Sequence, residues 1–496
     1  MAQGVLPYKY EEEKTESDMT ALAGLPVYLD LASVLGLGDH IQRHLQVKEQ
    51  GWTDEQSILA LILLNLAGGD SVDDLKVLEK DNGFCTILDR IETKGLSRKE
   101  RRAQERRWRK KCHRSVPSSS AMFRYLAAFH DPEEEKKREK GKAFIPLSNE
   151  HLRGLMNVNR DFIASIQKHR PTTEATLDMD ATLVETQKED ALFSYKGFKA
   201  YQPFNVWWAE TQLMLHTEFR DGNVPAGYEQ LRVLKEALEM LPEGVKKVYL
   251  RSDTAGYQHD LMKYCEQGNT PFGRVEFAIG ADVTKEFRKA VAEVEEWRPV
   301  MKEGKKTNKE WAEVCFVPNA IGSSKNGPAY RYLATREVLR QGELPGCEGQ
   351  LPFPTMEMDT ARYKVFGIVT NRDLEGSALV AWRYERCGKS EEAHSVMKED
   401  LAGGKLPSSD FGENAAWWWI MILALNLNTA MKQLVLQKSW AAKRMKALRF
   451  SLINLPGRIF TGARQLVIRI AKGHPSLTVL LEARQRIMGL AHASPG

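Results

Sequence analysis

Cysteine is scarce in this chain, and the few cysteines present are scattered. Only six occur among 496 residues, at positions 85, 112, 265, 315, 347 and 387, and no two of them form a C-x-x-C pair. Neither a disulfide framework nor a structural zinc site is therefore expected. A reducing, cytoplasmic location fits this composition best.

Long hydrophobic runs are also absent. The best candidate for a membrane span, residues 415–430, includes two asparagines and is shorter than the ~20 apolar residues that cross a bilayer. Residues 1–18 contain no apolar stretch of the kind found in signal peptides. We therefore expect neither a membrane protein nor a secreted one. With 28% charged and 42% hydrophobic residues, the chain is typical of a globular protein of more than one domain.

Acidic residues are nearly missing from the last part of the chain. Residues 431–496 hold 12 Lys or Arg and one acid, Glu482. The net charge of this segment is +11. Since the whole chain has a net charge of +5, the other residues sum to −6. A second basic block, residues 98–114, contains ten Lys or Arg and two Glu. Two basic segments beside an acidic middle indicate a polyanionic partner, although each segment alone fits a solvated helical face equally well.

Residues 20–130 are predicted to be mainly helical. The apolar run at residues 57–69 follows Thr53, a candidate N-cap, and ends in two glycines. Residues 117–131 predict another capped helix, which carries Arg124. Short helices beside a basic block suit a helix-turn-helix-like DNA-binding region, and a helical domain with no DNA role fits the same pattern.

From residue 175 the pattern changes to strands and helices. Three strand-like runs come first, closed by the turn R-D-G-N, and helix and strand then alternate up to residue 297. This order predicts an α/β fold with a mixed sheet. Residues 298–383 contain short strand-like runs, the last of them S-A-L-V-A-W-R-Y, and predict a β-rich insertion.

These patterns divide the chain into six segments. They are an N-terminal helical DNA-binding region (1–132), a linker and helix (133–174), the first part of the α/β core (175–297), the β-rich insertion (298–383), the last part of the core with a third acid (384–436) and a basic helical C-terminal tail (437–496). A long apolar helix is predicted over residues 415–436.

Three carboxylates on different elements are the main candidates for chemistry. Asp180 lies in the strand-like run A-T-L-D-M-D-A-T-L-V, Asp253 ends the strand K-K-V-Y-L-R-S-D, and Glu391 opens the helical stretch K-S-E-E-A-H-S-V-M-K-E-D-L. Asp178 points to the same strand face as Asp180 and remains an alternative, and we prefer Asp180 because it begins the D-x-T step. Asp253 is also a candidate helix cap, and Glu391, like Glu392, also fits a solvated helix acid.

Carboxylates on two strands and a helix are suitable ligands for two Mg²⁺ ions that catalyse phosphoryl transfer. Asp180 would bridge both ions, Asp253 would complete one coordination shell and Glu391 the other. No side-chain nucleophile is required, and the sequence contains no G-x-S-x-G, H-E-x-x-H, P-loop or G-x-G-x-x-G in a strand–helix context. If the three acids act together, the chain cuts and joins DNA.

Four segments resemble the motifs of one protein family. T-L-D-M-D-A-T, L-R-S-D-T-A-G-Y, R-Y-E-R-C-G-K-S-E-E-A-H-S-V-M-K-E-D-L and the following F-G-E-N-A-A-W-W-W-I-M-I-L-A-L-N-L-N resemble the DDE transposases of bacterial insertion sequences, most closely the insertion-sequence thirteen-eighty group. The resemblance extends over about residues 117–475 in motif order and spacing. Carried over by position, the acids of the family fall on Asp180, Asp253 and Glu391.

The resemblance implies a fold, a cofactor and a partner. The fold would be an RNase H-like core interrupted by a β-strand insertion, and the cofactor two Mg²⁺ ions, with Mn²⁺ as a substitute. The partner would be double-stranded DNA, namely the terminal inverted repeats of a mobile element and its target. A homodimer in a synaptic complex and a nucleoid-associated location in a bacterial cytoplasm are also implied.

The third motif of this superfamily, Y-x₂-R-x₃-E-x₆-K, is present with one departure. Tyr384 matches, and Glu391 and Lys398 stand seven residues apart, which places them on one face of an α-helix. The resemblance therefore implies that Lys398 contacts DNA phosphates near the metal site. The arginine position is occupied by Cys387.

Because that arginine is missing, we expect Arg386 or Lys389 to make its phosphate contact. Further DNA contacts are expected from the basic block and the helix after it, through Arg101, Arg102, Arg106, Arg107, Arg109, Lys110, Lys111 and Arg124. Trp297 and Trp311 flank the start of the insertion and are candidates for stacking on a flipped base, as in related enzymes that form a DNA hairpin. A place in the core of the β-rich segment is the alternative for both.

Three functions are consistent with these features. An active cut-and-paste DNA transposase accounts for the acids and for the basic segments. A catalytically silent or domesticated DNA-binding relative would be marked by a missing acid, and none is missing. A hydrolase that uses a carboxylate pair on sugars accounts for two acids but for neither basic segment. The active transposase is therefore the favoured prediction.

Overall fold

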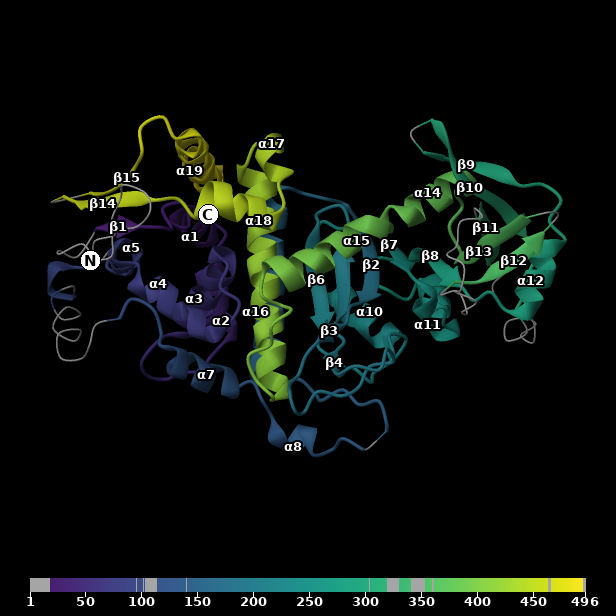
Figure 1. Cartoon of the computed structure of the whole chain (residues 1–496), viewed down its shortest axis with the longest axis horizontal. Coiled ribbons are helices and arrows are strands. Elements are labelled where there is room, and N and C mark those ends of the chain that lie inside the picture. Colours follow the sequence, from purple (N-terminus) through teal and green to yellow (C-terminus); the bar gives the residue numbers. More distant parts are fainter. Residues whose placement is uncertain are drawn as a thin grey trace, which may run out of the picture. The chain divides into compact units, whose positions relative to one another are not determined.

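The computed structural model describes most of the chain as two compact units (Figure 1). The described residues are 18–94, 96–100, 102, 114–139, 141–302, 304–318, 330–339, 353–358, 361–462 and 465–493. The terminal unit is formed by Met1–Asp131, Ser148–Val158 and Met397–Gly496, and the central unit by Pro132–Leu147 and Asn159–Val396.

The terminal unit is built around helix α16 (Phe411–Ala430), all of whose residues are buried. A helix that is apolar on every side needs neighbours all around it, and α1, α3 and α7 pack against it. The predicted long apolar helix is therefore confirmed, and it continues into a π-helical turn, Met431–Val435. The helices of this unit are α1 (Pro26–Val34), α2 (Leu37–His44), α3 (Asp54–Ala67), α4 (Leu75–Lys80), α5 (Asn82–Glu92), α7 (Ser119–Ala127), α16, α17 (Lys438–Ala441), α18 (Met445–Leu448) and α19 (Pro475–Ala493).

Two helix starts predicted from the sequence are confirmed. Thr53 caps α3 in a reciprocal capping box, because its hydroxyl accepts from the Gln56 backbone N–H while the Gln56 side chain accepts from the Thr53 N–H. Ser118 caps α7 by accepting from the Ala121 N–H. These caps satisfy N–H groups that the first helical turn leaves without partners.

The basic tail is not wholly helical, so that prediction is wrong in one segment. Strands β14 (Gly457–Thr461) and β15 (Leu466–Ile470) form a hairpin, and β14 also pairs with β1 (Met19–Thr20). In the hairpin, arginines such as Arg458 alternate with isoleucines such as Ile459, and this period of two is typical of a strand. The first described residues of the chain therefore share a sheet with the last segment.

The central unit contains one large mixed sheet with the strand order β6-β5-β2-β7-β8-β13-β11-β10-β9. Strand β7 is parallel to both β2 and β8, and the other pairings are antiparallel. The first five strands are β2 (Glu174–Ala181), β5 (Phe204–Trp208), β6 (Leu213–Glu218), β7 (Lys247–Ser252) and β8 (Glu276–Ala281). All of these strands were predicted from the sequence, and the mixed α/β sheet is confirmed.

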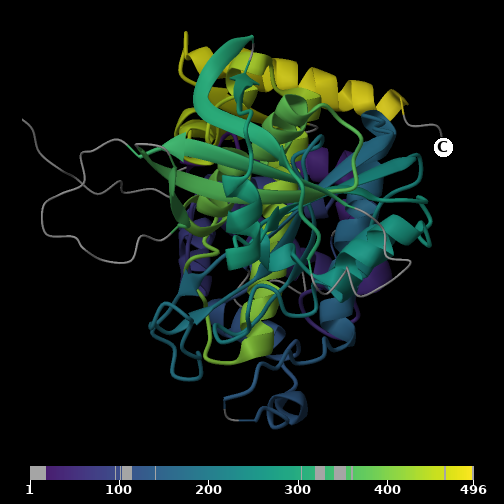
Figure 2. The same ribbon diagram turned by 90° about the vertical axis from the view of Figure 1, so that its right-hand side faces the viewer.

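Strands of the predicted insertion extend this same sheet. Strand β13 pairs antiparallel with β8. The strands beyond β13 lie on the side of the sheet that is nearest the viewer in Figure 2. The added strands are β9 (Arg298–Lys302), β10 (Lys305–Val314), β11 (Arg331–Val338), β12 (Thr355–Met358), which pairs with β13, and β13 (Ala361–Thr370). The chain leaves the core after β8 and returns to it through β13, so the strand next to the core is the last one of the insertion.

The run S-A-L-V-A-W-R-Y was predicted as a strand, and this is wrong. It forms helix α14 (Gly376–Tyr384), whose first turn is capped when the Glu375 carboxylate accepts from the Ala378 N–H at 3.0 Å. Leu379 and Val380 are buried and pack in one cluster with Trp311 on a face of the sheet. Packing at helical spacing therefore decided the structure of a short apolar run whose period was ambiguous.

Helices and turns complete the central unit. They are α8 (Pro132–Glu135), most of α9 (Glu150–His169), α10 (Gln230–Glu239), α11 (His259–Gln267), α12 (Lys285–Ala292), α14 and α15 (Arg386–Ser395). Two short strands, β3 (Val184–Glu185) and β4 (Ala200–Tyr201), pair with each other outside the large sheet. None of the helices in the described part of the chain is both long and apolar enough to cross a membrane.

Candidate active site

Two of the three predicted acids lie side by side at the ends of parallel strands. The register of β2 and β7 pairs Asp178 with Arg251 and Met179 with Ser252. One step further along both strands come Asp180 and Asp253, which therefore project from the same edge of the sheet. Their carboxylates are close enough for the charge of Asp180 to raise the pKa of Asp253.

Asp178, the alternative to Asp180, is committed to another role. Its two carboxylate oxygens accept from Nε and Nη2 of Arg251 at 2.6 and 2.8 Å, and both side chains are about 1–2% exposed. The remaining Nη1 of Arg251 donates to the Trp382 carbonyl at 2.6 Å. This bidentate pair is buried inside the sheet, where the Asp178 side chain is 1% exposed, whereas that of Asp180 is 22% exposed, which favours Asp180 as the acid of this strand that a metal ion can reach.

Asp180 is held by three side chains from α15. Arg386 Nη2 lies 3.0 Å from one carboxylate oxygen, and the Ser390 hydroxyl donates to the other at 3.1 Å. Nδ1 of His394 lies 3.9 Å from that second oxygen. Arg386 also donates to the Met179 carbonyl at 3.1 Å. The sequence prediction included Arg386 but missed Ser390 and His394, although their spacing of four residues places them on one helix face.

His394 is oriented by the neighbouring strand. Its Nε2 lies 3.2 Å from Nδ2 of Asn205, and Oδ1 of Asn205 accepts from the Thr217 hydroxyl at 2.6 Å. This contact holds one edge of the ring against β5 and turns Nδ1 toward Asp180. The strands β5 and β6 therefore orient a histidine beside the candidate acid.

Asp253 serves as a cap and is also held in an unfavourable environment. Its carboxylate accepts from the Ala255 N–H at 3.0 Å, so the predicted capping role is confirmed. Burial raises the pKa of this carboxyl, the Arg386 guanidinium lowers it, and the Asp180 carboxylate raises it again, with a net rise. Capping uses one carboxylate oxygen and leaves the other available for a ligand.

Glu391 lies on α15 but is not gathered with the two aspartates. The helix is broken at Cys387 and Gly388, and Gly388 has a φ of 94°, which favours glycine. Regular helix resumes after this break, and Ser390 faces Asp180 while the neighbouring Glu391 is exposed. Within the residues that the structure describes, no three His, Cys, Asp or Glu side chains are placed to share one metal ion.

The predicted shared face of Glu391 and Lys398 depended on continuous α-helix. Regular α-helix ends at Ser395, and Val396–Asp400 forms a π-helical turn that contains Lys398. The seven-residue spacing therefore does not by itself place the two side chains on one face. The DNA role of Lys398 stays a prediction.

A divalent cation fits the two aspartates in chemical character. Hard carboxylate oxygens from adjacent strand ends are the ligands that Mg²⁺ prefers, and a cation would favour the charged form of Asp253, whose pKa is raised by burial and by the Asp180 charge. The Asp180 carboxylate is already balanced by Arg386, whose pKa the surrounding aspartates raise although burial lowers it. Two of the three predicted ligands thus suit a metal ion, and Glu391 would have to join them.

The other predicted contact residues of the central unit have defined places. The hydroxyl of Tyr384 lies 3.3 Å from that of Thr335, and the Lys309 ammonium lies 3.9 Å from its ring centroid. Tyr384 is thus engaged by β10 and β11. Lys389 is exposed just after the break in α15. Their DNA contacts stay predictions.

The two tryptophans of the insertion differ from each other. Trp311 is 4% exposed in a core cluster with Leu333 and Ile368, as the alternative to base stacking required. Trp297 is half-buried, and its ring stacks on the Arg336 guanidinium at 4.2 Å. Trp311 is therefore removed as a stacking candidate by its burial, whereas Trp297 remains one.

The basic block lies mostly outside the described residues. This applies to Arg101, Arg106, Arg107, Arg109, Lys110 and Lys111. Arg102 is exposed in a helical position, and Arg124 is exposed on α7, where its Nε donates to the Ser120 carbonyl at 3.1 Å. The DNA contacts of this block stay predictions.

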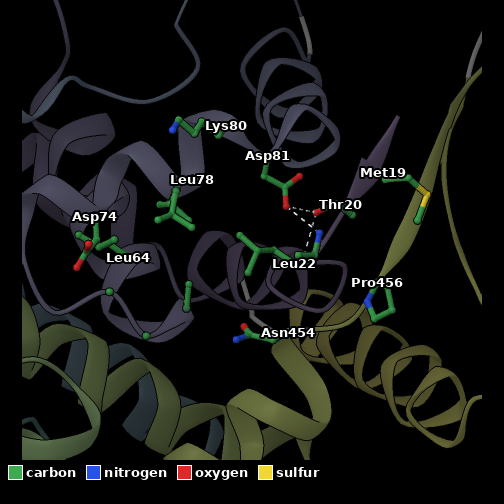
Figure 3. A pocket seen from close by; sticks show the side chains of 15 residues that line it. Met19, Thr20, Leu22, Leu64, Asp74, Leu78, Lys80, Asp81, Asn454 and Pro456 are labelled. Atoms are coloured by element: carbon green, nitrogen blue, oxygen red, sulfur yellow. Dashed lines mark hydrogen bonds between the residues drawn. The ribbon is translucent and has the colours of Figure 1, made fainter. Parts of the chain in front are cut away.

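A pocket in the terminal unit holds none of the predicted site residues (Figure 3). It has a volume of about 920 Å³ and a mainly apolar lining between α3, α4 and β1. At one side, Asp81 accepts from the Thr20 hydroxyl at 2.9 Å and from the Ala21 N–H at 2.8 Å. These polar contacts tie β1 to α5.

Comparison with known proteins identifies the family. A family model described as transposase DDE domain group 1 matches residues 11–492, nearly the whole chain. The chain therefore belongs to this family of DDE transposases. Among solved structures it is similar to a cryo-EM structure of the piggyBac transposase synaptic complex with hairpin DNA, at 11% identity and a TM-score of 0.39, over 88% of this chain and 80% of that chain. No curated protein matches the chain.

Proposed function

We propose that the chain is an active DNA transposase of an insertion sequence. It would bind the terminal inverted repeats, cleave the ends of the element and join them to target DNA. The observation that carries this proposal is the placement of Asp180 and Asp253 beside each other at the ends of β2 and β7, in a chain of the DDE transposase family. The strand order β6-β5-β2-β7-β8 supports an RNase H-like core beneath these acids.

Asp180 and Asp253 would hold divalent ions, with Glu391 as the third ligand. Two Mg²⁺ ions, or Mn²⁺ in their place, would activate the attacking water or 3′-hydroxyl and stabilise the leaving oxygen of an in-line displacement. The chain supplies the orientation: Ser390 and Arg386 fix the carboxylate of Asp180, and the Ala255 N–H fixes that of Asp253.

Helix α15 is the element that would deliver the third acid. It already contacts Asp180 through Ser390 and His394, and Glu391 is the next residue along the helix from Ser390. The break at Gly388 gives this helix a point about which its direction can change. A rotation of the helix after this break by one residue position, about 100° about its axis, would turn Glu391 toward the aspartates.

Joining two element ends to one target requires both ends in one complex. We therefore propose a homodimer on DNA, with double-stranded inverted repeats and target DNA as its partners. Lys389 and Lys398, the basic block and the basic tail would hold this DNA through its phosphates, a contact that weakens steeply with salt.

The test is a cleavage and strand-transfer assay on duplex DNA that carries the sequences flanking the gene. Asp180→Ala, Asp253→Ala and Glu391→Ala should each abolish both reactions in Mg²⁺. Glu392→Ala and Asp282→Ala are the matched controls, because both remove exposed acids, one from α15 and one from the end of β8. They should leave activity near that of the wild type.

Two results would contradict the proposal at different levels. Full activity of one alanine variant would remove that residue from the site. Activity that survives the loss of all three acids, or its absence from the wild type on DNA with intact flanking repeats, would refute the active transposase itself.

A further inference from the structure

Arg383 places a positive charge beside Asp253. A Cβ atom added to Gly280 would lie 3.0 Å from Nη2 of Arg383 and 2.9 Å from the backbone nitrogen of Thr254. The guanidinium group is therefore packed at the end of β8, next to the peptide that follows Asp253. In the described part of the chain, it makes no ion pair, and its buried Nε has no hydrogen-bond partner.

The neighbouring Arg386 is only partly satisfied as well. Its Nη2 contacts Asp180 and the Met179 carbonyl, but its buried Nε has no partner among the described residues. The charges of Arg383 and Arg386 are close enough to repel each other. Two donor groups without acceptors therefore lie on the side of the site where the two aspartates end.

An unpaired guanidinium in such a place is costly to the folded protein. A charge that is removed from water without a compensating partner destabilises the fold, and arginine does not escape the cost by losing its proton. Of the two nearby acids, Asp180 is paired with Arg386, and Asp253 attracts the Arg383 guanidinium through its charge but forms no ion pair with it among the described residues. An anion bound beside the Arg383 guanidinium would therefore lower this cost.

The glycine at position 280 fits this interpretation. Strand β8 faces the guanidinium at this point, and any side chain would meet either Nη2 of Arg383 or the Asp253–Thr254 backbone at about 3 Å. The residue without a side chain thus leaves the space that the arginine head occupies. Gly280 therefore allows Arg383 to pack directly against the backbone of β8.

We propose that Arg383 binds a phosphate of the DNA strand that lies on Asp180 and Asp253. The planar fork of a guanidinium group matches the two free oxygens of a phosphodiester. The inference rests on the proposed function, since that reaction brings a phosphate to these acids. The third motif has Cys387 at the position where an arginine is expected. Arg383, four residues earlier, would supply a guanidinium group in its place.

The experiment measures binding of a short duplex oligonucleotide by the full chain in EDTA, where no cleavage can occur. Arg383→Gln should weaken binding by about tenfold to a hundredfold, the range for a charged hydrogen bond, and should lower the slope of log K against log salt by about one. Arg383→Lys should keep the slope and lose part of the affinity, because it keeps the charge without the fork.

Arg288→Gln is the matched control, because it removes an exposed arginine from α12 in the same unit. It should leave affinity and slope unchanged. Competition by inorganic phosphate at constant ionic strength adds a second readout: phosphate should displace DNA better than chloride does from the wild type and from Arg288→Gln, and no better than chloride from Arg383→Gln.

Thermal unfolding without DNA separates binding from a structural role. Because Arg383 gains its anionic partner only when DNA binds, its replacement should not lower the melting temperature of the free protein. Arg383→Gln should therefore melt at or above the wild-type temperature. Wild-type affinity, slope and phosphate competition in Arg383→Gln would overturn the inference. If the wild type shows no cleavage activity in Mg²⁺, that result would count against the proposed function but would not change the interpretation of these binding measurements.

Discussion

The interior of the central sheet and the strand ends next to it carry the same kinds of charge in opposite arrangements. Inside, Asp178 and Arg251 form a closed pair in which both carboxylate oxygens are used. Two residues further along the same strands, Asp180 and Asp253 meet two arginines, and the donors and acceptors do not match. A few ångströms of strand therefore separate a structural charge pair from a reactive one.

The difference shows where the fold tolerates unsatisfied groups. A buried ion pair must be complete, because removing one partner leaves an uncompensated charge in a medium that solvates it poorly. At the end of a strand, solvent and ligands can complete the set instead. Stability is therefore expected to depend on the interior pair, and binding and catalysis on the strand-end residues.

The largest expected effect comes from breaking the interior pair. Arg251→Met removes the partner of Asp178 and should lower the free energy of unfolding by about 3–5 kcal/mol, measured by urea denaturation. The double variant Asp178→Leu with Arg251→Met should recover much of this loss, because no charge is left unpaired. A single variant as stable as the wild type would show that the pair is not the closed structural unit described here.

A third buried carboxyl, Asp221, gives a case between the two. One oxygen accepts from Arg138 Nε at 2.9 Å, while the other has no partner among the described residues. Burial raises the pKa of Asp221 to about 6, from an ordinary value of 3.8, although Arg138 lowers it. The folded state therefore holds this proton more tightly than the unfolded state does.

Stability contributed by Asp221 should be complete below about pH 3.8 and lost as pH rises through about 6. A shift of this size corresponds to about 3 kcal/mol between the two limits. Asp221→Asn keeps an acceptor for Arg138 and should not show this fall. The measurement is the difference in unfolding free energy between the two proteins at pH 4 and pH 7.5, and a difference that does not change with pH would contradict the expectation.

The smallest effect is expected at Asp253, where stability and activity should separate. Asparagine can cap the Ala255 N–H as well as aspartate does, and it removes a carboxylate that burial and Asp180 destabilise. Asp253→Asn should therefore melt slightly above the wild type at neutral pH while losing cleavage activity. The gain should vanish at acid pH, where the wild-type carboxyl is protonated in both states, and a lower melting temperature at pH 7 would place Asp253 with the interior pair.

The acids on parallel strands were predictable because their position follows from strand ends. Asp180 and Asp253 each stand at the end of an apolar run, and parallel pairing then brings them to one edge. The choice between Asp178 and Asp180 required the register, since only the pairing with Arg251 shows which acid is neutralised. Sequence alone carries no register between strands about 70 residues apart.

Helix α14 shows why the rest was harder to predict. Its short run contains both a strand-like alternation and a helical spacing, and contacts with Trp311 from a distant strand decide between them. Because Arg383 lies in this run, its place beside Asp253 was hidden as well. Glu391 was found by motif spacing, but the break at Gly388 changes where a spacing rule puts its side chain.

The pairing of β1 with β14 has a consequence for synthesis of the chain. Met19 and Thr20 form their strand contacts with Arg458 and Gly457, and β1 has no other partner in the described sheets. At about 5–20 residues per second, a ribosome needs roughly 15–65 s to proceed from Asp131 to Gly457. During that interval the central unit can fold, whereas β1 has not yet met its partner strand β14. The order of translation therefore makes the terminal unit the last part of the chain to be completed.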